Sequence, residues 1–251
     1  MEAMAFELKG TTAFFKKPDA NVNVYFTYNH IHRVALLGLL GAILGYGGYT
    51  AQHIQVERDG ANSGNRYPEF YQRLQHLQIA IVPHGDRGYF AKKIQTFNNS
   101  VGYASAEDGR NLVVREQWIE HPHWTIYLLN DGSEEYLKLE DSLLHHKSVY
   151  IPYLGKNDHP ATIGNPRQLQ LSALNTMPMI HSLVYADAVK FGKRTNGEQP
   201  YYYQEFLPVG LDQDLNDYCF RQVVHTNRKV EYTAEGERFY EGEGNVLYFT
   251  T

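Results

Sequence analysis

Apolar and polar positions along the chain alternate with two different periods, and each period predicts one kind of element. Segments 5–9 and 22–28 alternate side chain by side chain, which is typical of strands. The run RVALLGLLGAILG over 33–45 is apolar nearly all round and predicts a helix buried against a sheet. Its glycines fall on one helical face, where a partner can approach the backbone closely; they are Gly38, Gly41 and Gly45.

Further along, the pattern predicts a helix over 68–77, a strand over 78–83 and a core strand over 121–129. Ser133 with two acidic residues behind it predicts a capped helix that runs to His145. Repeated prolines in the last hundred residues favour strands and loops there. The order of strands and helices is close to the beginning of a ferredoxin-like sandwich, so we expect an α+β fold.

Composition bounds the class of protein. The chain has 251 residues, of which 43% are hydrophobic and 20% charged, which is typical of a folded globular protein. We expect a core over 1–150 and a β-rich extension over 151–251 that packs on it. Cys219 is the single cysteine, which excludes an internal disulfide framework and suits a reducing cytosol. An acidic start without a long apolar run makes a signal peptide unlikely, and we expect a cytoplasmic protein without a membrane partner.

Several common chemistries lack their motifs in this sequence. GxxxxGK, GxGxxG, HExxH and GxSxG are all absent, which removes support for nucleotide hydrolysis, dinucleotide chemistry and common hydrolases. Close histidine pairs occur, including His121 with His123 and His145 with His146, but no acidic cluster completes a metal-binding set. We therefore expect no metal and no cofactor, and ordinary half-buried or exposed imidazoles.

One segment differs in character from the acidic chain around it. The net charge is −5, yet RGYFAKKIQTFNNSVGY over 87–103 contains three cations and no acid, with aromatic residues and amides between them. Single-stranded RNA is held by cations on phosphates, amides on base edges and aromatic faces for stacking, so the segment indicates RNA binding. An ordinary surface hairpin with a basic face explains the composition equally well. Lys16, Lys17 and Lys156 add charge if the fold brings them near.

Five sequence blocks in order resemble a known family, and they cover about residues 6–161. They read FELKGTTAFFK, YNHIHRVALLGLLGAILG, VPHGDRGYFAKKIQTFNN, VREQWIEHPHWTIYLL and VYIPYLGKNDHPA. The arrangement is similar to Cas five proteins, subunits of type I CRISPR surveillance complexes (Cascade) in the repeat-associated RNA-binding superfamily. The form is most similar to those of subtype I-B. The last ninety residues match weakly.

The resemblance implies a ferredoxin-like, RRM-related core with a thumb hairpin at about 83–115 and a variable C-terminal β-rich lobe. It implies a non-catalytic antiviral subunit that caps the 5′ repeat-derived handle of the crRNA. It also implies contacts with the backbone subunit and the large subunit of the ribonucleoprotein complex, and with target DNA indirectly. The candidate RNA contacts are Arg33, Tyr46, Arg87, Lys92, Lys93, Gln95, Asn98, Asn99 and Lys156, with a packing role for Tyr46 equally open.

Two other readings stay open. One branch of this family, which serves subtype I-C, cuts precursor RNA without metal by means of a tyrosine, a lysine and a histidine. Tyr46 with His145, His146 and Lys147 offers the same residue types for general acid–base cleavage, although here the histidine precedes the lysine at a helix end. This metal-independent endoribonuclease is the main alternative. A protein-interaction module that binds no RNA is the third.

Overall fold

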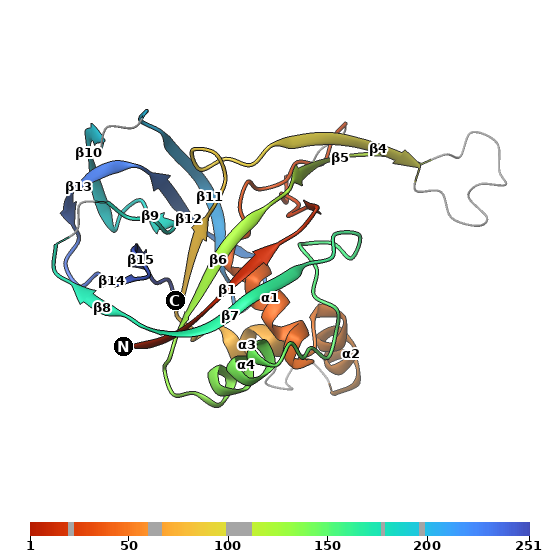
Figure 1. Ribbon diagram of the computed structural model, residues 1–251. Coiled ribbons are helices and arrows are strands. Elements are labelled where there is room, and N and C mark those ends of the chain that lie inside the picture. Colours follow the sequence, from red (N-terminus) through yellow and green to blue (C-terminus); the bar gives the residue numbers. More distant parts are fainter. Residues whose placement is uncertain (20–22, 60–66, 99–111, 177–178, 196–198) are drawn as a thin grey trace.

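The computed structural model describes residues 1–19, 23–59, 67–98, 112–176, 179–195 and 199–251 (Figure 1). Its central sheet has four strands in the order β3-β6-β1-β7, and every neighbouring pair is antiparallel. In chain order the sheet and its helices are β1 (Glu2–Lys9), α1 (Arg33–Leu44), α3 (Glu69–Leu74), β3 (Ile79–Pro83), β6 (His123–Leu129), α4 (Glu134–Leu144) and β7 (Thr162–Gln170). A β-α-β-β-α-β order with the first strand between the third and fourth is the ferredoxin-like topology. The predicted α+β fold with a ferredoxin-like core is therefore confirmed.

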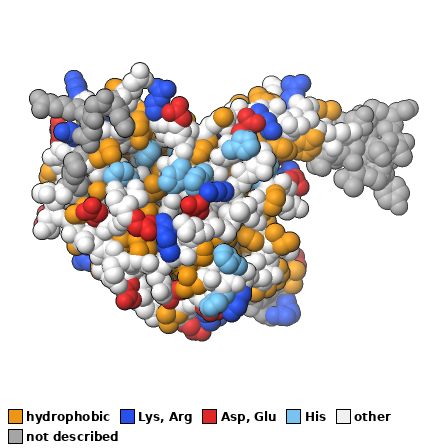
Figure 2. All heavy atoms as spheres, in the orientation of Figure 1, with side chains coloured by type: hydrophobic (Ala, Val, Ile, Leu, Met, Phe, Trp, Pro, Cys, Tyr) orange, Lys and Arg blue, Asp and Glu red, His pale blue; other side chains and the backbone are white. Residues whose placement is uncertain are grey.

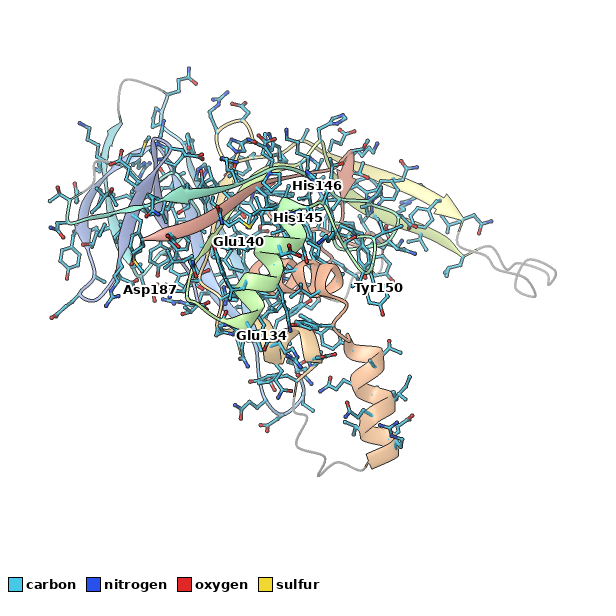
Figure 3. The ribbon with its side chains drawn as sticks, turned by 60° about the horizontal axis from the view of Figure 1, so that its bottom comes forward. Glu134, Glu140, His145, His146, Tyr150 and Asp187 are labelled. Carbon is cyan, nitrogen blue, oxygen red and sulfur yellow. The ribbon has the colours of Figure 1, made fainter. Side chains whose placement is uncertain are left out.

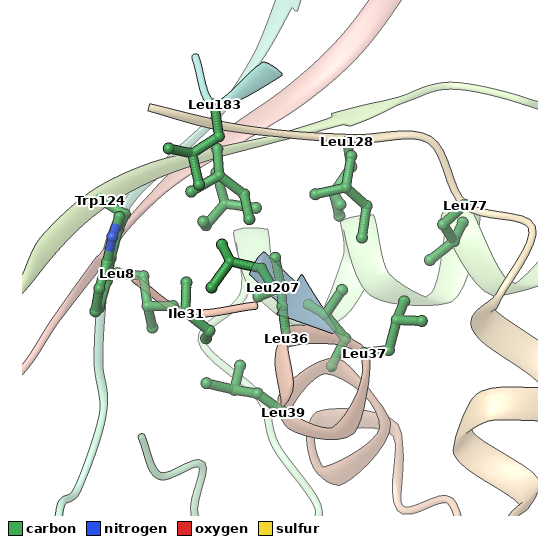
Figure 4. Packing of buried hydrophobic residues seen from close by; sticks show 14 of the residues in the cluster. Leu8, Ile31, Leu36, Leu37, Leu39, Leu77, Trp124, Leu128, Leu183 and Leu207 are labelled. Atoms are coloured by element: carbon green, nitrogen blue, oxygen red, sulfur yellow. The ribbon is translucent and has the colours of Figure 1, made fainter. Parts of the chain in front are cut away.

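The two faces of the central sheet carry different side chains because strand residues alternate. On one face Met4, Phe6 and Leu8 of β1 belong to the main core, which α1 and α4 also enter. On the other face Ala3 and Ala5 lie in a smaller cluster, which includes residues of the hairpin made by β14 (Phe239–Gly242) and β15 (Asn245–Tyr248). Figure 4 shows the main core, where leucines of α1 meet strand residues from both halves of the chain. Each fully buried leucine contributes roughly 1.5–3 kcal/mol.

The predicted helices are confirmed, and one helix was missed. α1 begins after His32, whose Nδ1 accepts the N–H of Ala35 at 3.2 Å, and ends at Gly45 in the left-handed conformation. Ser133 caps α4 by accepting the N–H of Tyr136. The additional helix, α2 (Tyr49–Asp59), follows a bend of 77° after α1. Its residues are largely exposed, so the apolar periodicity that predicts a buried helix is weak there.

The strand predicted over 22–28 is wrong in its described part, residues 23–28. Only isolated bridges form there, from Thr27 to Lys16 and from Tyr25 to Glu116. The alternation of side chains is real, but the backbone finds no partner over a continuous run. This segment instead lies beside a three-stranded sheet in the order β2-β5-β4, made by β2 (Thr12–Ala13), β4 (Lys92–Asn98) and β5 (Val113–Glu120).

The final part of the chain is β-rich, as predicted, and the described residues after 151 contain no helix. Its strands are β8 (Ser172–Leu174), β9 (Val184–Tyr185), β10 (Val189–Thr195), β11 (Tyr202–Leu211), β12 (Tyr218–Thr226), β13 (Arg228–Thr233), β14 (Phe239–Gly242) and β15 (Asn245–Tyr248). Leu183, Leu207 and Val223 join the same core as α1. The division of the chain at residue 150 stays a prediction, and β7, which follows it, pairs with β1 in the central sheet.

Among the described helices, no single one is long and apolar enough to cross a membrane, and α1 and α2 meet that test only as a bent pair.

The glycines of α1 differ in how closely α3 approaches them. A Cβ added at Gly41 would lie 2.5 Å from the Cβ of Phe70, whereas one at Gly38 would lie 3.8 Å from the Phe70 ring. We expect Gly41→Ala to lower the free energy of unfolding by about 1–3 kcal/mol through overpacking. Gly38→Ala, its matched control, should raise that free energy by up to ~1 kcal/mol, because alanine favours helix. Urea unfolding measures both, and equal changes in the two variants would contradict the packing described.

The helix cap at His32 predicts a dependence of stability on pH. Burial lowers the pKa of His32 to about 3, and the pKa of the likewise buried His225 to about 4. Because unfolded histidines bind protons near pH 6.5 and these folded ones do not, the free energy of unfolding falls as the pH drops below about 6.5. For His32 alone the expected loss between pH 7.5 and pH 5 is about 2 kcal/mol.

His32→Asn tests this dependence, since asparagine caps a helix without titrating. The comparison is between slopes of unfolding free energy against pH, so a general loss of packing in the variant does not affect it. The variant should lose less stability between pH 7.5 and pH 5 than the original protein. The same slope in both proteins would exclude His32 as a source of the pH dependence.

Candidate nucleic-acid interface

The β4–β5 hairpin projects from the body of the protein beyond the edge of the central sheet (Figure 1). Its arms are β4 and β5, of which β5 runs to Glu120 and so passes the predicted end at 115, and the segment between the arms, 99–111, lies outside the described residues. Residues directly opposite in the ladder share a face, so the register sorts the candidate residues. Lys92 lies opposite Ile119 and Lys93 opposite Trp118, which places the two neighbouring lysines on opposite faces.

We name the first face the Trp118 face, and it consists of Lys93, Gln95, Phe97, Glu116 and Trp118. Lys156, from the loop before β7, reaches it: its Nζ lies 3.2 Å from Glu116 and 5.1 Å from the centre of the Phe97 ring. The structure thus brings together the predicted Lys93, Gln95 and Lys156.

The charges on the Trp118 face are already matched within the protein. Lys93 lies 3.4 Å from Glu120, and Lys156 lies within 3.2 Å of both Glu116 and Asp158. Glu116 is buried and also accepts the indole N–H of Trp118 at 2.8 Å. A phosphate would have to displace these carboxylates, so this face offers aromatic rings and one amide more readily than positive charge.

We name the opposite face the Lys92 face, and it consists of Lys92, Ile94, Thr96, Asn98, Val113, Arg115, Gln117 and Ile119. Near its base Lys17 pairs with Glu205 at 2.6 Å. Burial lowers the pKa of Lys92. The Glu205 carboxylate raises that pKa and the Lys17 ammonium lowers it further, so all three groups lie close together. Lys92, Lys17 and Arg115 are three cations here, and the nearby carboxylates are Glu205, which pairs with Lys17, and Asp19, which also acts on the Tyr28 ring beside Lys17. This face therefore carries the surplus of positive charge that a phosphate backbone requires.

The sequence analysis did not name Arg115 as a candidate RNA contact. It included Lys17 only on the condition that the fold brings it near the basic segment. Arg115 has a signal in the strand period: Thr96 of β4 lies opposite Arg115, two ladder positions beyond the pair of Ile94 with Gln117. That signal becomes usable only once the register is known. In Figure 2 the blue spheres of lysine and arginine lie along the hairpin beside red carboxylates, which shows that its positive charge is interrupted rather than continuous.

Arg33 is a correction, because the structure buries it with only 6% of its surface exposed. Its guanidinium donates to three backbone carbonyls: Nη1 to Thr250 at 2.9 Å, and Nη2 to Gln75 at 2.7 Å and to Leu77 at 2.8 Å. These bonds join the start of α1 to the end of α3 and to the last residues of the chain. The prediction that Arg33 contacts RNA is wrong, since a guanidinium whose donors serve buried carbonyls cannot reach a phosphate.

Tyr46 lies after α1, and the packing role that was left open for it is the one observed. Its ring packs against the main core, and the guanidinium of Arg73 lies 5.0 Å from the ring centre. Arg87 is exposed in the turn before β4, where its Nη1 donates to Gln199 at 3.1 Å. Arg87 and Asn98 stay predictions as RNA contacts, and the predicted contact Asn99 lies outside the described residues.

The histidine pairs do not assemble a metal site in the part of the chain that the structure describes, where no three histidine, cysteine or acidic side chains converge. His123 instead stacks on His84, with ring centres 4.3 Å apart. His84 contacts the hydroxyl of Thr125 at 2.7 Å, and burial lowers the pKa of both imidazoles. His121 lies in a left-handed turn outside β6, so it does not share a strand face with His123.

No protein-family model and no curated protein matches the sequence. Among solved structures, the chain is similar to a CRISPR protein from Archaeoglobus fulgidus, with 11% identity over 98% of each chain and a TM-score of 0.49. It is similar to a chain of a CRISPR RNA-guided surveillance complex, with 13% identity over 91% of each chain and a TM-score of 0.46. A third likeness, to a chain of the type III-B Cmr-beta complex bound to cognate target RNA, has 9% identity over 99% of this chain and 86% of that one, with a TM-score of 0.45. All three identities lie far below the range in which residue roles transfer between proteins.

Proposed function

We propose that the protein is a non-catalytic subunit of a type I CRISPR complex, Cascade, in the cytoplasm. It binds and caps the 5′ repeat-derived handle of the crRNA, and it contacts the backbone subunit and the large subunit, so target DNA is engaged indirectly. The resemblance to Cas five proteins, most of all those of subtype I-B, supplies the identity of the RNA. The residues of the hairpin supply the means of binding.

The observation that carries this proposal is the surplus of positive charge on the Lys92 face of a projecting hairpin. The whole chain is acidic, with a net charge of −5, so general attraction to nucleic acid does not explain binding. Lys92, Lys17 and Arg115 concentrate positive charge at one place, while the Trp118 face of the same hairpin supplies the half-buried rings of Phe97 and Trp118. Cations for phosphates and rings for bases are the two parts of a single-stranded RNA site.

The test is to purify the assembly from cells that express the full set of subunits and to sequence the RNA that accompanies it. We expect crRNA molecules with one common 5′ end, because a handle bound in a fixed register is protected from that end. An assembly that contains this protein but no nucleic acid would contradict the proposal and favour the protein-interaction module. RNA with scattered 5′ ends would contradict handle capping.

The endoribonuclease alternative needs the Tyr46 hydroxyl beside the histidines at the end of α4, whereas the Tyr46 ring contacts an arginine that bonds the start of that helix. Arg73, which covers the ring of Tyr46, bonds Glu135 in the first turn of α4 at 3.2 Å. His145 and His146 follow the last turn, as Figure 3 shows with Glu134 at the other end. The helix rises 1.5 Å per residue, so from Glu135 to Leu144 it spans about 13 Å.

His145 and Lys147 also have a local explanation, since both contact Asp141 within α4 and its end, at 2.9 Å and 3.3 Å. Incubation of the purified protein with a repeat hairpin in the presence of a chelator tests the alternative. We expect the RNA to stay intact. A single defined cut that His146→Ala abolishes would establish metal-independent cleavage and overturn the non-catalytic assignment.

A further inference from the structure

A hollow of about 500 Å³ lies at the surface between the turn that joins β11 to β12 and the start of α2. The RNA-binding proposal does not use it. Its lining residues combine aromatic rings with hydrogen-bond acceptors; they are Pro18, Tyr49, Asn216, Asp217, Tyr218 and Phe220.

Three aromatic rings form the walls of the hollow. Tyr49 is 45% exposed and Phe220 is 44% exposed, which is unusual for two large rings that border one cavity. The Tyr218 ring packs edge-on against Phe220, with ring centres 6.1 Å apart, and against the buried His32, with ring centres 5.4 Å apart. These two contacts fix the position of the Tyr218 ring. Burial raises the pKa of Tyr49 and of Tyr218, which keeps both phenols neutral. Neutral rings present electron-rich faces that attract a cation.

The turn before Tyr218 holds its polar groups in a defined geometry. The Asp212 carboxylate accepts the backbone N–H groups of Asp214, Leu215 and Asp217 at 2.8 to 2.9 Å. These bonds lower the pKa of Asp212, so it remains ionised and the turn stays closed. Asn216 adopts a left-handed φ of 59°, and its Oδ1 is buried without a hydrogen-bond partner among the described residues.

The charge around the hollow has one sign. Asp217 lines it, Asp212 and Asp214 belong to the same turn, and no lining residue is a cation. The nearby Lys17 is already paired with Glu205. Phosphates of RNA would meet these carboxylates at close range, which disfavours a nucleotide here. A planar cation with several N–H donors satisfies the acceptors and the aromatic faces together.

We propose that the hollow is a protein-docking site that receives an arginine side chain from a basic segment of a neighbouring protein. The guanidinium lies against the rings of Tyr49 and Phe220 and donates to the Asp217 carboxylate. The proposal goes beyond RNA binding, because it assigns a protein partner to a hollow that no hairpin residue lines.

Titration of the full-length protein with the peptide Gly-Gly-Arg-Gly-Gly tests the proposal, with the same peptide carrying citrulline in place of arginine as the uncharged control. We expect shifts of NMR signals from the turn between β11 and β12 at millimolar peptide, and binding about tenfold tighter for arginine than for citrulline. Phe220→Ala and Asp217→Asn should each weaken arginine binding about fivefold to tenfold. Phe206→Ala is the matched control, since Phe206 is 61% exposed on β11 and does not line the hollow.

Equal binding of the two peptides would overturn the proposal, and so would unchanged binding in Phe220→Ala. A single-stranded RNA oligonucleotide that displaces the arginine peptide and shifts the same signals would overturn it in favour of a base-binding pocket. Urea unfolding of each variant separates a lost contact from a lost fold, because the replaced side chains are exposed.

Discussion

Arg33→Met is expected to lower the free energy of unfolding by about 3–5 kcal/mol, the largest effect on stability that we predict. The variant removes five N–H donors from a buried position and leaves the carbonyls of Gln75 and Leu77 without their partner, while the Thr250 carbonyl keeps the N–H of Ile79 at 3.0 Å. Burial lowers the pKa of Arg33, and the fork of three hydrogen bonds offsets the cost of holding the guanidinium out of water. Urea unfolding at neutral pH measures the loss.

Two variants sharpen the result. Arg33→Lys keeps the charge but has one nitrogen in place of a planar fork, so an intermediate loss is expected. Arg73→Met removes an exposed arginine that pairs with Glu69 and Glu135, and should cost less than about 1 kcal/mol. If Arg33→Met unfolded at the original urea concentration and yet lost RNA binding, Arg33 would be an RNA contact after all.

The largest expected effect on binding is that of reversing charge on the Lys92 face. Lys92→Glu combined with Arg115→Glu should weaken binding of the crRNA handle on the order of 100-fold, about 1.4 kcal/mol for each position. With alanine at both positions, the slope of log affinity against log salt should become shallower by roughly 1.4, since each lost phosphate contact to a single strand removes about 0.7. Titration of labelled handle RNA at several salt concentrations measures both quantities.

Lys93→Glu is the matched control, because Lys93 follows Lys92 in the chain and lies on the Trp118 face beside Glu120. We expect a loss of fivefold or less, about 1 kcal/mol. The reverse ranking, in which Lys93→Glu abolishes binding and the Lys92 face tolerates reversal, would place the RNA on the Trp118 face. Equal losses would mean that net charge alone matters.

The parts of the fold that could be predicted are those in which burial fixes the residue pattern. α1 is apolar nearly all round because it is covered on several sides, and α4 carries its own cap at Ser133. α2 is largely exposed, so nothing in its apolar pattern distinguishes it from a loop. The wrong strand over 22–28 shows the opposite case, in which side chains alternate but the backbone makes only single bridges.

The candidate site was predicted in location but not in arrangement. Residues close in the chain were grouped together, yet a strand sends Lys92 and Lys93 to opposite faces. One of the two carboxylates that neutralise Lys156 comes from Glu116, forty residues away, and composition within one segment does not reveal it. Arg33 stood at the start of an apolar helix, where a cation is expected to reach solvent, and only the fold shows that three carbonyls enclose it.

The two-residue repeat of the hairpin arms limits how their length can change. Adding one residue to β4 after Lys93 would turn every later side chain of that strand to the opposite face. Asn98 would then share a face with Trp118, and Phe97 would share a face with Arg115. Adding two residues would lengthen the reach by about 6.8 Å and keep every group on its own side. Engineered or natural variants of this hairpin should therefore grow and shrink in even steps.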